Sequence, residues 1–219
     1  MTEGINIDID FLHSFVIQWF IKNGRVFPWR LTKNPYNIFI AEALLRRTKA
    51  DIVVAPYLEL IKRFPTPYHL SDADISKLRD WFQPLGLVRR ADQIVSAAKA
   101  IVEEHRGIVP NKLDELMALP GIGVYSGRAI ACLAFDAVVP MIDESSGRLL
   151  RRLFRLSLKG PAYSDKKLRQ IAEKIIPKNN ARDFNLGLLD IAYYYCKPLR
   201  PNCASCPLYS NCSYAALTQ

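Results

Sequence analysis

Apolar side chains recur along this chain at intervals of three and four residues, which places them on one face of an α-helix. Alternating apolar and polar runs, which are typical of strands, are scarce. Proline and glycine separate the helical stretches. The pattern predicts an all-α protein with helices at residues 7–24, 39–53, 55–64, 72–82, 90–105, 111–119, 125–135, 145–157, 165–176 and 183–196.

The first three of these helices carry more detailed expectations. Helices 39–53 and 55–64 are expected to separate near Pro56, because proline disrupts a helix interior. Helix 7–24 ends at Asn23-Gly24, a favourable helix end, and its predicted apolar face consists of Phe11, Leu12, Phe15, Trp19 and Phe20.

The chain has 219 residues and a formal net charge of +9, which favours a polyanionic partner such as nucleic acid. No apolar run approaches the ~20 residues of a membrane span, and the acidic N-terminus is unlike a secretory signal, so we expect a cytoplasmic protein, nucleoid-associated if prokaryotic. A phosphate-binding stripe on one helix face is predicted from the spacing of Arg148, Arg151, Arg152 and Arg155.

A glycine-rich turn, LPGIG at residues 119–123, separates two expected helices. Gly121 and Gly123 lack side chains where the chain turns tightly or another backbone approaches. The amides that open the following helix suit an anion such as a DNA phosphate. An ordinary turn between two helices is the alternative.

Asp143 lies where an apolar segment meets the basic helix. One interpretation is an N-cap, which is the usual role of an aspartate at such a place. The other is a functional carboxylate in a partly dry pocket, able to stabilise positive charge on a sugar or to activate water. The residues alone leave both interpretations open.

Four of the five cysteines lie near the C-terminus, with the spacing C-x6-C-x2-C-x5-C. Without a secretion signal, this grouping indicates a metal or cluster site rather than a disulfide scaffold. Zinc and a [4Fe–4S] cluster both accept four thiolates, and chemistry alone leaves the choice open. Cys132 is expected to be a packed core thiol, whereas the candidate ligands are Cys196, Cys203, Cys206 and Cys212.

Together these features resemble the helix-hairpin-helix DNA glycosylases of the endonuclease III family, over nearly the whole chain. The cysteine spacing is similar to the family's [4Fe–4S] signature, so the resemblance implies that cofactor. It also implies two helical domains flanking a DNA-binding cleft. These would be a six-helix domain at 27–138, with its hairpin at about 112–134, and a domain of 1–26 with 139–219, with its cluster loop at 196–212.

The resemblance also implies the reaction. Tyr125 stands where bifunctional members carry a lysine that attacks the sugar, and a phenol cannot form that imine. A monofunctional glycosylase is therefore expected, similar to the thymine-DNA mismatch branch that acts on G:T and G:U. The implied catalytic residues are Asp143, Tyr125 and Glu42, of which Glu42 matches the acid of adenine glycosylases.

The expected partner is double-stranded DNA with a mismatched or damaged base, bound by a monomer through base flipping. Leu87 matches the family's wedge, and Arg46 or Arg47 would enter the helix to face the widowed guanine. The other expected DNA contacts are Gly121, Gly123 and Arg148.

Two alternatives to a thymine or uracil glycosylase remain. Glu42 supports an adenine glycosylase acting on A:G or A:8-oxoguanine. A non-catalytic DNA-binding module is supported by Glu144, because the family commonly has a small residue after its aspartate. The wedge loop also appears one residue shorter than in relatives, and Val88 offers no polar group for base selection.

Overall fold

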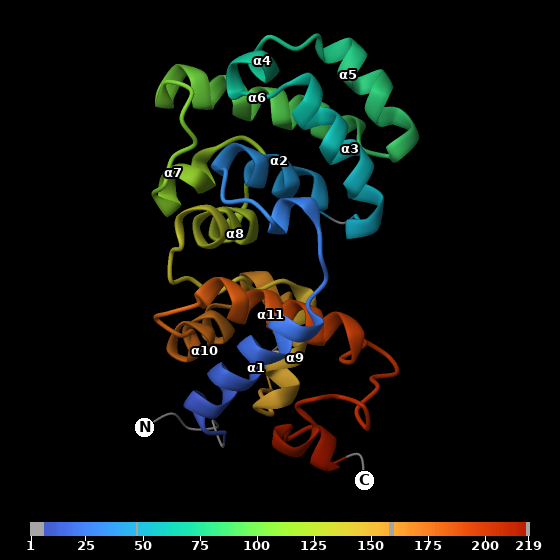
Figure 1. The fold of residues 1–219 in the computed structure, drawn as a ribbon, viewed down its shortest axis with the longest axis vertical. Helices are drawn as coiled ribbons and strands as arrows, with labels where there is room; N and C mark the ends of the chain where they lie inside the picture. Colours follow the sequence, from blue (N-terminus) through green and yellow to red (C-terminus); the bar gives the residue numbers. More distant parts are fainter. Residues whose placement is uncertain (1–6, 47, 158–159, 218–219) are drawn as a thin grey trace. The chain divides into compact units, whose positions relative to one another are not determined.

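The computed structural model describes residues 7–46, 48–157 and 160–217, and all regular secondary structure in these residues is helical (Figure 1). The all-α prediction is therefore confirmed. No helix in this part of the chain is long and apolar enough to cross a lipid bilayer. The α-helices are α1 (Ile9–Asn23), α2 (Pro35–Leu45), α3 (Ala50–Arg63), α4 (Pro67–Ser71), α5 (Ile75–Phe82), α6 (Val88–His105), α7 (Leu113–Ala118), α8 (Val124–Phe135), α9 (Glu144–Leu153), α10 (Lys166–Ile175) and α11 (Ala181–Tyr194).

The chain divides into two compact units. The continuous unit is Val26–Asp136 and contains α2 to α8, with short 3-10 segments at Pro28–Arg30 and Gln83–Leu85. The discontinuous unit is Met1–Arg25 with Ala137–Gln219 and contains α1 and α9 to α11. It also holds 3-10 segments at Ala162–Ser164, Tyr209–Asn211 and Ala215–Leu217.

Helix α2 forms the centre of the continuous unit. It starts where the Asn34 side chain accepts hydrogen bonds from the amides of Tyr36 and Asn37, with Pro35 at the first helical position. Its residues 38–44 are all buried, and it packs against α3, α6 and α8. A helix buried on all sides holds its side chains rigidly, and those side chains include Glu42.

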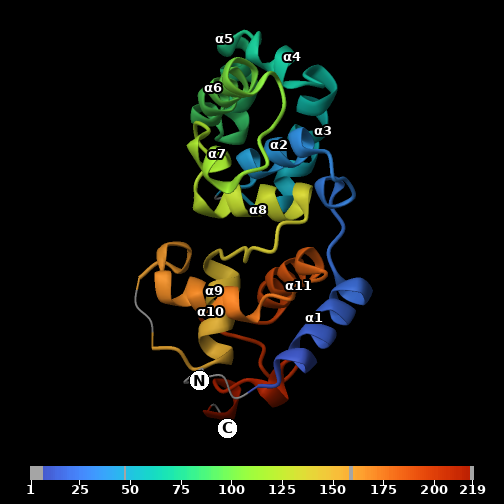
Figure 2. The same ribbon diagram turned by 90° about the vertical axis from the view of Figure 1, so that its left-hand side faces the viewer.

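In the discontinuous unit α1 packs along α11, and α11 packs against α9 (Figures 1 and 2). A side chain at Gly187 of α11 would lie 2.7 Å from Val16 Cγ1, so glycine permits the close approach of α1. Asp190, with a fully buried side chain, accepts hydrogen bonds from the Arg25 amide and from Arg25 Nε, at 2.8 and 2.7 Å. This ion pair joins the last residue of the first chain segment to α11.

The predicted helix 39–53 is wrong, because the chain leaves the helical conformation at Arg46 and a new helix begins at Ala50. Pro56 does not end a helix either, since α3 runs through it to Arg63. A proline removes only its own amide from the hydrogen-bond ladder, and burial of Pro56 among the core side chains offsets that loss. The sequence between the two helices contains no proline or glycine, so the pattern did not reveal the break.

The predicted face of the first helix is partly wrong. Leu12 and Val16 are fully buried, whereas Phe11 is 43% exposed and stacks on Phe15 with ring centroids 5.4 Å apart. The helix ends at Gly24 as predicted, where a Cβ atom would lie 2.5 Å from the Phe20 ring. Val16 faces Gly187 of α11, where the two helices come close together, so this small side chain takes the buried position.

Candidate functional site

The turn between α7 and α8 is a tight hairpin whose apolar residues point inward. Leu119 and Ile122 are buried, and the Ile122 amide donates to the Leu119 carbonyl oxygen at 3.0 Å. Gly121 has φ +78°, a conformation that side chains disfavour, and a Cβ there would lie 2.9 Å from Gln93 Cβ. Gly121 is thus required by the turn and by its packing on α6.

Gly123 has a different environment. It is the N-cap of α8, makes no side-chain capping bond, and has no atom within 4 Å of the position of a Cβ. The first amides of a helix have no partner within the helix, and they lie at the positive end of its dipole. The N-terminal end of α8 therefore leaves room for an anion, such as a phosphate group, to approach closely.

Tyr125 and Glu42 belong to the same unit. Tyr125 is half-buried in the first turn of α8, directly after the hairpin. Glu42 lies on α2, which packs against α8, and it is 4% exposed. A buried carboxyl group and a phenol thus stand on two packed helices, and the first turn of α8 carries no lysine.

Asp143 belongs to the discontinuous unit and is the N-cap of α9. Its Oδ1 accepts hydrogen bonds from the amides of Ser145 and Ser146, at 2.9 and 2.7 Å, and from the Ser146 hydroxyl at 2.9 Å. The Asp143 amide donates in turn to Ser146 Oγ, which completes a capping box. The capping interpretation is confirmed. Oδ2 accepts no hydrogen bond from any residue that the structure describes, so capping leaves one carboxylate oxygen for chemistry.

Glu144, which departs from the pattern of the family, has a structural role. Its Oε1 accepts a hydrogen bond of 2.8 Å from the amide of Ala162, at the start of the 3-10 segment between α9 and α10. The Glu144 carboxylate therefore stabilises the chain's own backbone at Ala162. Its presence gives no support to the alternative of a non-catalytic DNA-binding module.

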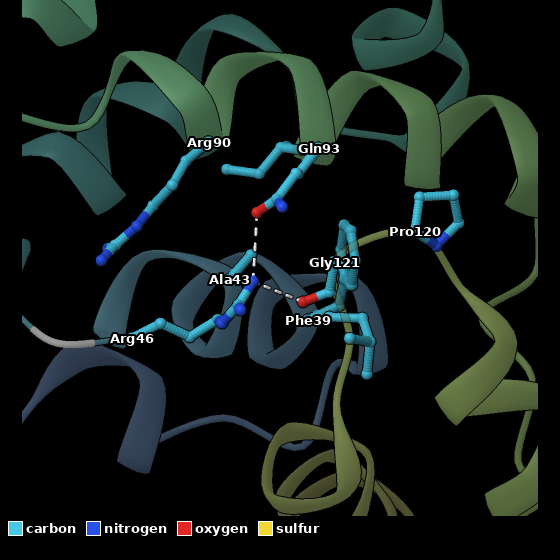
Figure 3. A pocket seen from close by; sticks show the side chains of 9 residues that line it. Phe39, Ala43, Arg46, Arg90, Gln93, Pro120 and Gly121 are labelled. Atoms are coloured by element: carbon cyan, nitrogen blue, oxygen red, sulfur yellow. Dashed lines mark hydrogen bonds between the residues drawn. The ribbon is translucent and has the colours of Figure 1, made fainter.

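Arg46 follows the last residue of α2 and lines a small pocket with α6 and the hairpin (Figure 3). Its Nη1 donates to Gln93 Oε1 at 3.0 Å and to the Gly121 carbonyl oxygen at 2.7 Å. Arg90 donates to the Leu44 carbonyl oxygen. The sequence shows Arg90 as one of two adjacent arginines, but neither it nor Gln93 was predicted as a site residue, although their spacing of three on a helix places both on one face.

Leu87 precedes the first residue of α6 and is only 4% exposed. A wedge must enter the DNA stack, so this side chain would have to leave its buried position when DNA binds. Arg47, the alternative to Arg46, lies outside the described residues. The DNA-contacting roles of these residues stay predictions.

The predicted phosphate-binding stripe is wrong as a stripe. Arg155 lies beyond the end of α9 with φ +52°, so it does not continue the helical face. Arg151 forms an ion pair with Asp165 at 2.9 Å. Arg148 Nε donates to the Cys196 carbonyl oxygen at 2.7 Å. These side chains hold the protein's own loops.

The C-terminal cysteines line one small cavity, together with apolar side chains of α9 and the loop. Arg152 fixes the start of the loop by donating to Cys196 Sγ at 3.4 Å and to the Lys197 carbonyl oxygen at 2.7 Å. Burial and then the neighbouring cysteines raise the pKa of Cys206 to about 11, as expected for a thiol in an apolar cavity. The fifth cysteine, Cys132, is fully buried in α8, as predicted.

An iron–sulfur cluster takes four cysteine thiolates, and four thiols line this one cavity. Within residues 7–46, 48–157 and 160–217, however, no group of three or more His, Cys, Asp or Glu side chains is arranged to hold a metal ion, so the structure does not bring these four thiols together as ligands.

Comparisons of the sequence and the fold with known proteins find similar DNA glycosylases. Over 215 residues the chain is 34% identical to a thymine/uracil-DNA glycosylase of Methanothermobacter thermautotrophicus, covering 98% of this chain and 97% of the relative. It is 33% identical over 201 residues to an adenine DNA glycosylase of Buchnera aphidicola subsp. Baizongia pistaciae, covering 91% of this chain but 57% of that protein. The solved structure of a thermostable thymine-DNA glycosylase matches with a TM-score of 0.89 at 32% identity, covering 95% and 97% of the two chains.

Residues 40–178 match the family model described as the HhH-GPD superfamily base excision DNA repair protein. These residues include the hairpin, Glu42, Tyr125 and Asp143. The chain therefore belongs to the HhH-GPD superfamily of base excision DNA repair proteins.

Proposed function

We propose that this protein is a monofunctional DNA glycosylase that hydrolyses the N-glycosidic bond of thymine or uracil mispaired with guanine. The observation that carries the proposal is Tyr125, in the first turn of α8 directly after the hairpin. A phenol cannot form the Schiff base of a bifunctional enzyme, so water must be the nucleophile. Similarity to a thymine/uracil-DNA glycosylase over 98% of the chain supports the choice of base.

The partner is double-stranded DNA, bound by a monomer. The first turn of α8 after Gly123 holds a backbone phosphate, since the helix dipole is positive there and the space beside Gly123 is open. A glycosidic bond inside a duplex is inaccessible, so the target nucleotide must be extruded. Leu87 and Arg46 then occupy the gap, with Arg46 toward the widowed guanine.

Asp143 carries the charge that the reaction requires. Breaking the glycosidic bond leaves positive charge on the sugar, and a fixed carboxylate stabilises that charge. The bonds to Ser145 and Ser146 fix the orientation of this carboxylate through Oδ1 and leave Oδ2 available. Glu42 and Tyr125 contact the base or position the attacking water.

We further propose that Cys196, Cys203, Cys206 and Cys212 hold a [4Fe–4S] cluster. The support is the shared apolar cavity and the spacing of the four thiols. When bound, the cluster supplies cross-links that hold the loop, and the arginines of α9 fix the start of the same loop. No step of base release passes through it.

A Cys206→Ser variant is expected to lose most of its iron, because one of four thiolates is removed. The measurement is iron per chain, about four in the wild type, together with the broad visible absorbance of the purified protein. Cys132→Ala is the matched control, since Cys132 is buried in α8 of the continuous unit and does not line the cavity, and it is expected to keep the iron. Colourless wild-type protein that contains zinc would contradict the proposal.

The function is tested with end-labelled duplexes that carry G:T, G:U, A:G or A:8-oxoguanine, each incubated with and without subsequent alkali. We expect cleavage at G:T and G:U that appears only after alkali, because water attack leaves an intact strand with an abasic site. Strand breaks without alkali would contradict the argument from Tyr125.

An adenine glycosylase is the second candidate. Buried Glu42 and the 33% identity to an adenine DNA glycosylase favour it, although the chain spans just over half of that relative. Cleavage at A:G or A:8-oxoguanine, without cleavage at G:T, would establish this activity instead. Binding to every duplex without any base release would indicate the non-catalytic module.

A further inference from the structure

The segment that joins α9 to α10 is attached to one face of α9. Glu144 Oε1 accepts the hydrogen bond of the Ala162 amide at 2.8 Å, and a Cβ atom at Gly147 would lie 2.2 Å from Ala162 Cβ. Arg151 donates to the Gly160 carbonyl oxygen at 3.0 Å. The three residues of α9 follow one another at spacings of four or fewer, so a single face of the helix holds the segment.

This attachment places the segment close to Asp143. Asp143 is the N-cap of α9, and Glu144, the next residue, is bonded directly to Ala162. Adjacent Cα atoms are only about 3.8 Å apart. A DNA strand whose sugar faces Asp143 therefore passes close to the residues that follow Ala162.

Tyr163, the residue after Ala162, is 49% exposed on a fixed backbone. Its carbonyl oxygen accepts from Arg169 Nη2 at 3.2 Å, and the amide before it is the one that Glu144 binds. The Tyr163 ring is thus held in contact with water rather than packed into the core. A tyrosine hydroxyl is one of the groups that donate hydrogen bonds to DNA phosphates.

Two lysines follow Tyr163 in the first turn of α10. Lys166 and Lys167 are both exposed, and they lie at the positive end of the helix dipole, where a cation is unfavourable. Asp165, the only carboxylate between residues 160 and 170, is already paired with Arg151 at 2.9 Å. A bound anion would offset the repulsion between these lysines and the dipole.

We propose that Tyr163, Lys166 and Lys167 form a DNA contact that binds backbone phosphates beside the target nucleotide. This proposal rests on the proposed function, in which the sugar of that nucleotide faces Asp143. A phenol and two cations match a polyanionic strand, and phosphate contacts position a protein on DNA without reading its sequence. The surface gives the discontinuous unit a phosphate contact of its own, close to its catalytic carboxylate.

The test measures affinity for a duplex that carries a tetrahydrofuran abasic-site analogue opposite guanine, over a range of salt concentrations, so that no base release is required. The variants are Tyr163→Ala, Tyr163→Phe and the double variant Lys166→Gln/Lys167→Gln. The matched control is Lys174→Gln/Lys178→Gln, which removes two exposed lysines at and beyond the other end of α10. Urea unfolding of each variant shows whether the fold is retained.

We expect Tyr163→Ala to weaken binding about tenfold and Tyr163→Phe about threefold, because phenylalanine keeps the ring and loses the hydroxyl. The Lys166→Gln/Lys167→Gln variant should lower the slope of log affinity against log salt concentration by about one to two, since each phosphate contact contributes about 0.9. Its stability should not fall, because the lysines oppose the dipole. The control should keep the wild-type slope.

The proposal is overturned if Tyr163→Ala binds as tightly as wild type, if Lys166→Gln/Lys167→Gln keeps the wild-type slope, or if the control lowers the slope equally. If Tyr163→Ala is unfolded, Tyr163→Phe decides in its place. Single-turnover release of uracil from G:U tests the proposed function separately. If wild-type protein releases no base but these variants still lose affinity, the contact stands and the activity does not.

Discussion

An Asp143→Asn variant is expected to release base about 10²–10⁴-fold more slowly than wild type. Its affinity for mismatched DNA is expected to equal that of wild type. Asparagine keeps a carbonyl oxygen for the amides of Ser145 and Ser146, and it caps helices about as well as aspartate. The fold is therefore retained. The loss is confined to the negative charge that faces the sugar in the transition state.

The rate is measured under single-turnover conditions on G:U and G:T duplexes, with binding measured separately. Asp74→Asn is the matched control, because Asp74 caps α5 through the same bonds to the amides two and three residues ahead. It should leave base release unchanged. Release by Asp143→Asn at the wild-type rate would reduce Asp143 to a helix cap.

An Asp190→Ala variant is expected to be less stable to urea by about 3–5 kcal/mol. The Asp190 side chain is fully buried and accepts from both the amide and the guanidinium of Arg25. Removal of the Asp190 carboxylate leaves the Arg25 donors unpaired where water has little access. This destabilises the fold by more than the intact ion pair stabilises it. Urea unfolding monitored by circular dichroism gives the change in the free energy of unfolding.

Lys33→Ala is the control for this experiment. It breaks the ion pair with Asp136, whose two side chains are 62% and 60% exposed, and such pairs contribute about 0–1 kcal/mol. If both variants showed an equally small decrease in the free energy of unfolding, the Arg25 guanidinium would have to reach solvent when Asp190 is replaced.

The local features of the fold were predictable from the sequence because they depend on neighbouring residues. The hairpin followed from Gly121 and its flanking helices, and the cap of α9 followed from Asp143 and the residues just after it. The all-α class followed from apolar spacing along the chain. Each of these depends on interactions within a few residues, so the neighbouring sequence identifies the interacting groups.

The features that the sequence did not reveal depend on partners far along the chain. Arg148 and Arg152 donate to carbonyl oxygens more than forty positions away, and the predicted DNA contact of Arg148 stays a prediction. Periodicity shows that two arginines share a face and not what lies opposite that face. The contact between Arg46 and Gly121 was hidden for the same reason, since 75 positions separate them.

Different requirements favour glycine at the two positions of the hairpin. A side chain at position 121 is opposed by both the backbone angle and the contact with Gln93, so folding itself favours glycine there. Position 123 has ordinary angles and open space, so folding alone would let it drift to alanine or serine over evolutionary time. A descendant that abandoned DNA could therefore lose Gly123 while keeping Gly121, and position 123 is the one whose variation among sequences would report whether the hairpin still binds a phosphate.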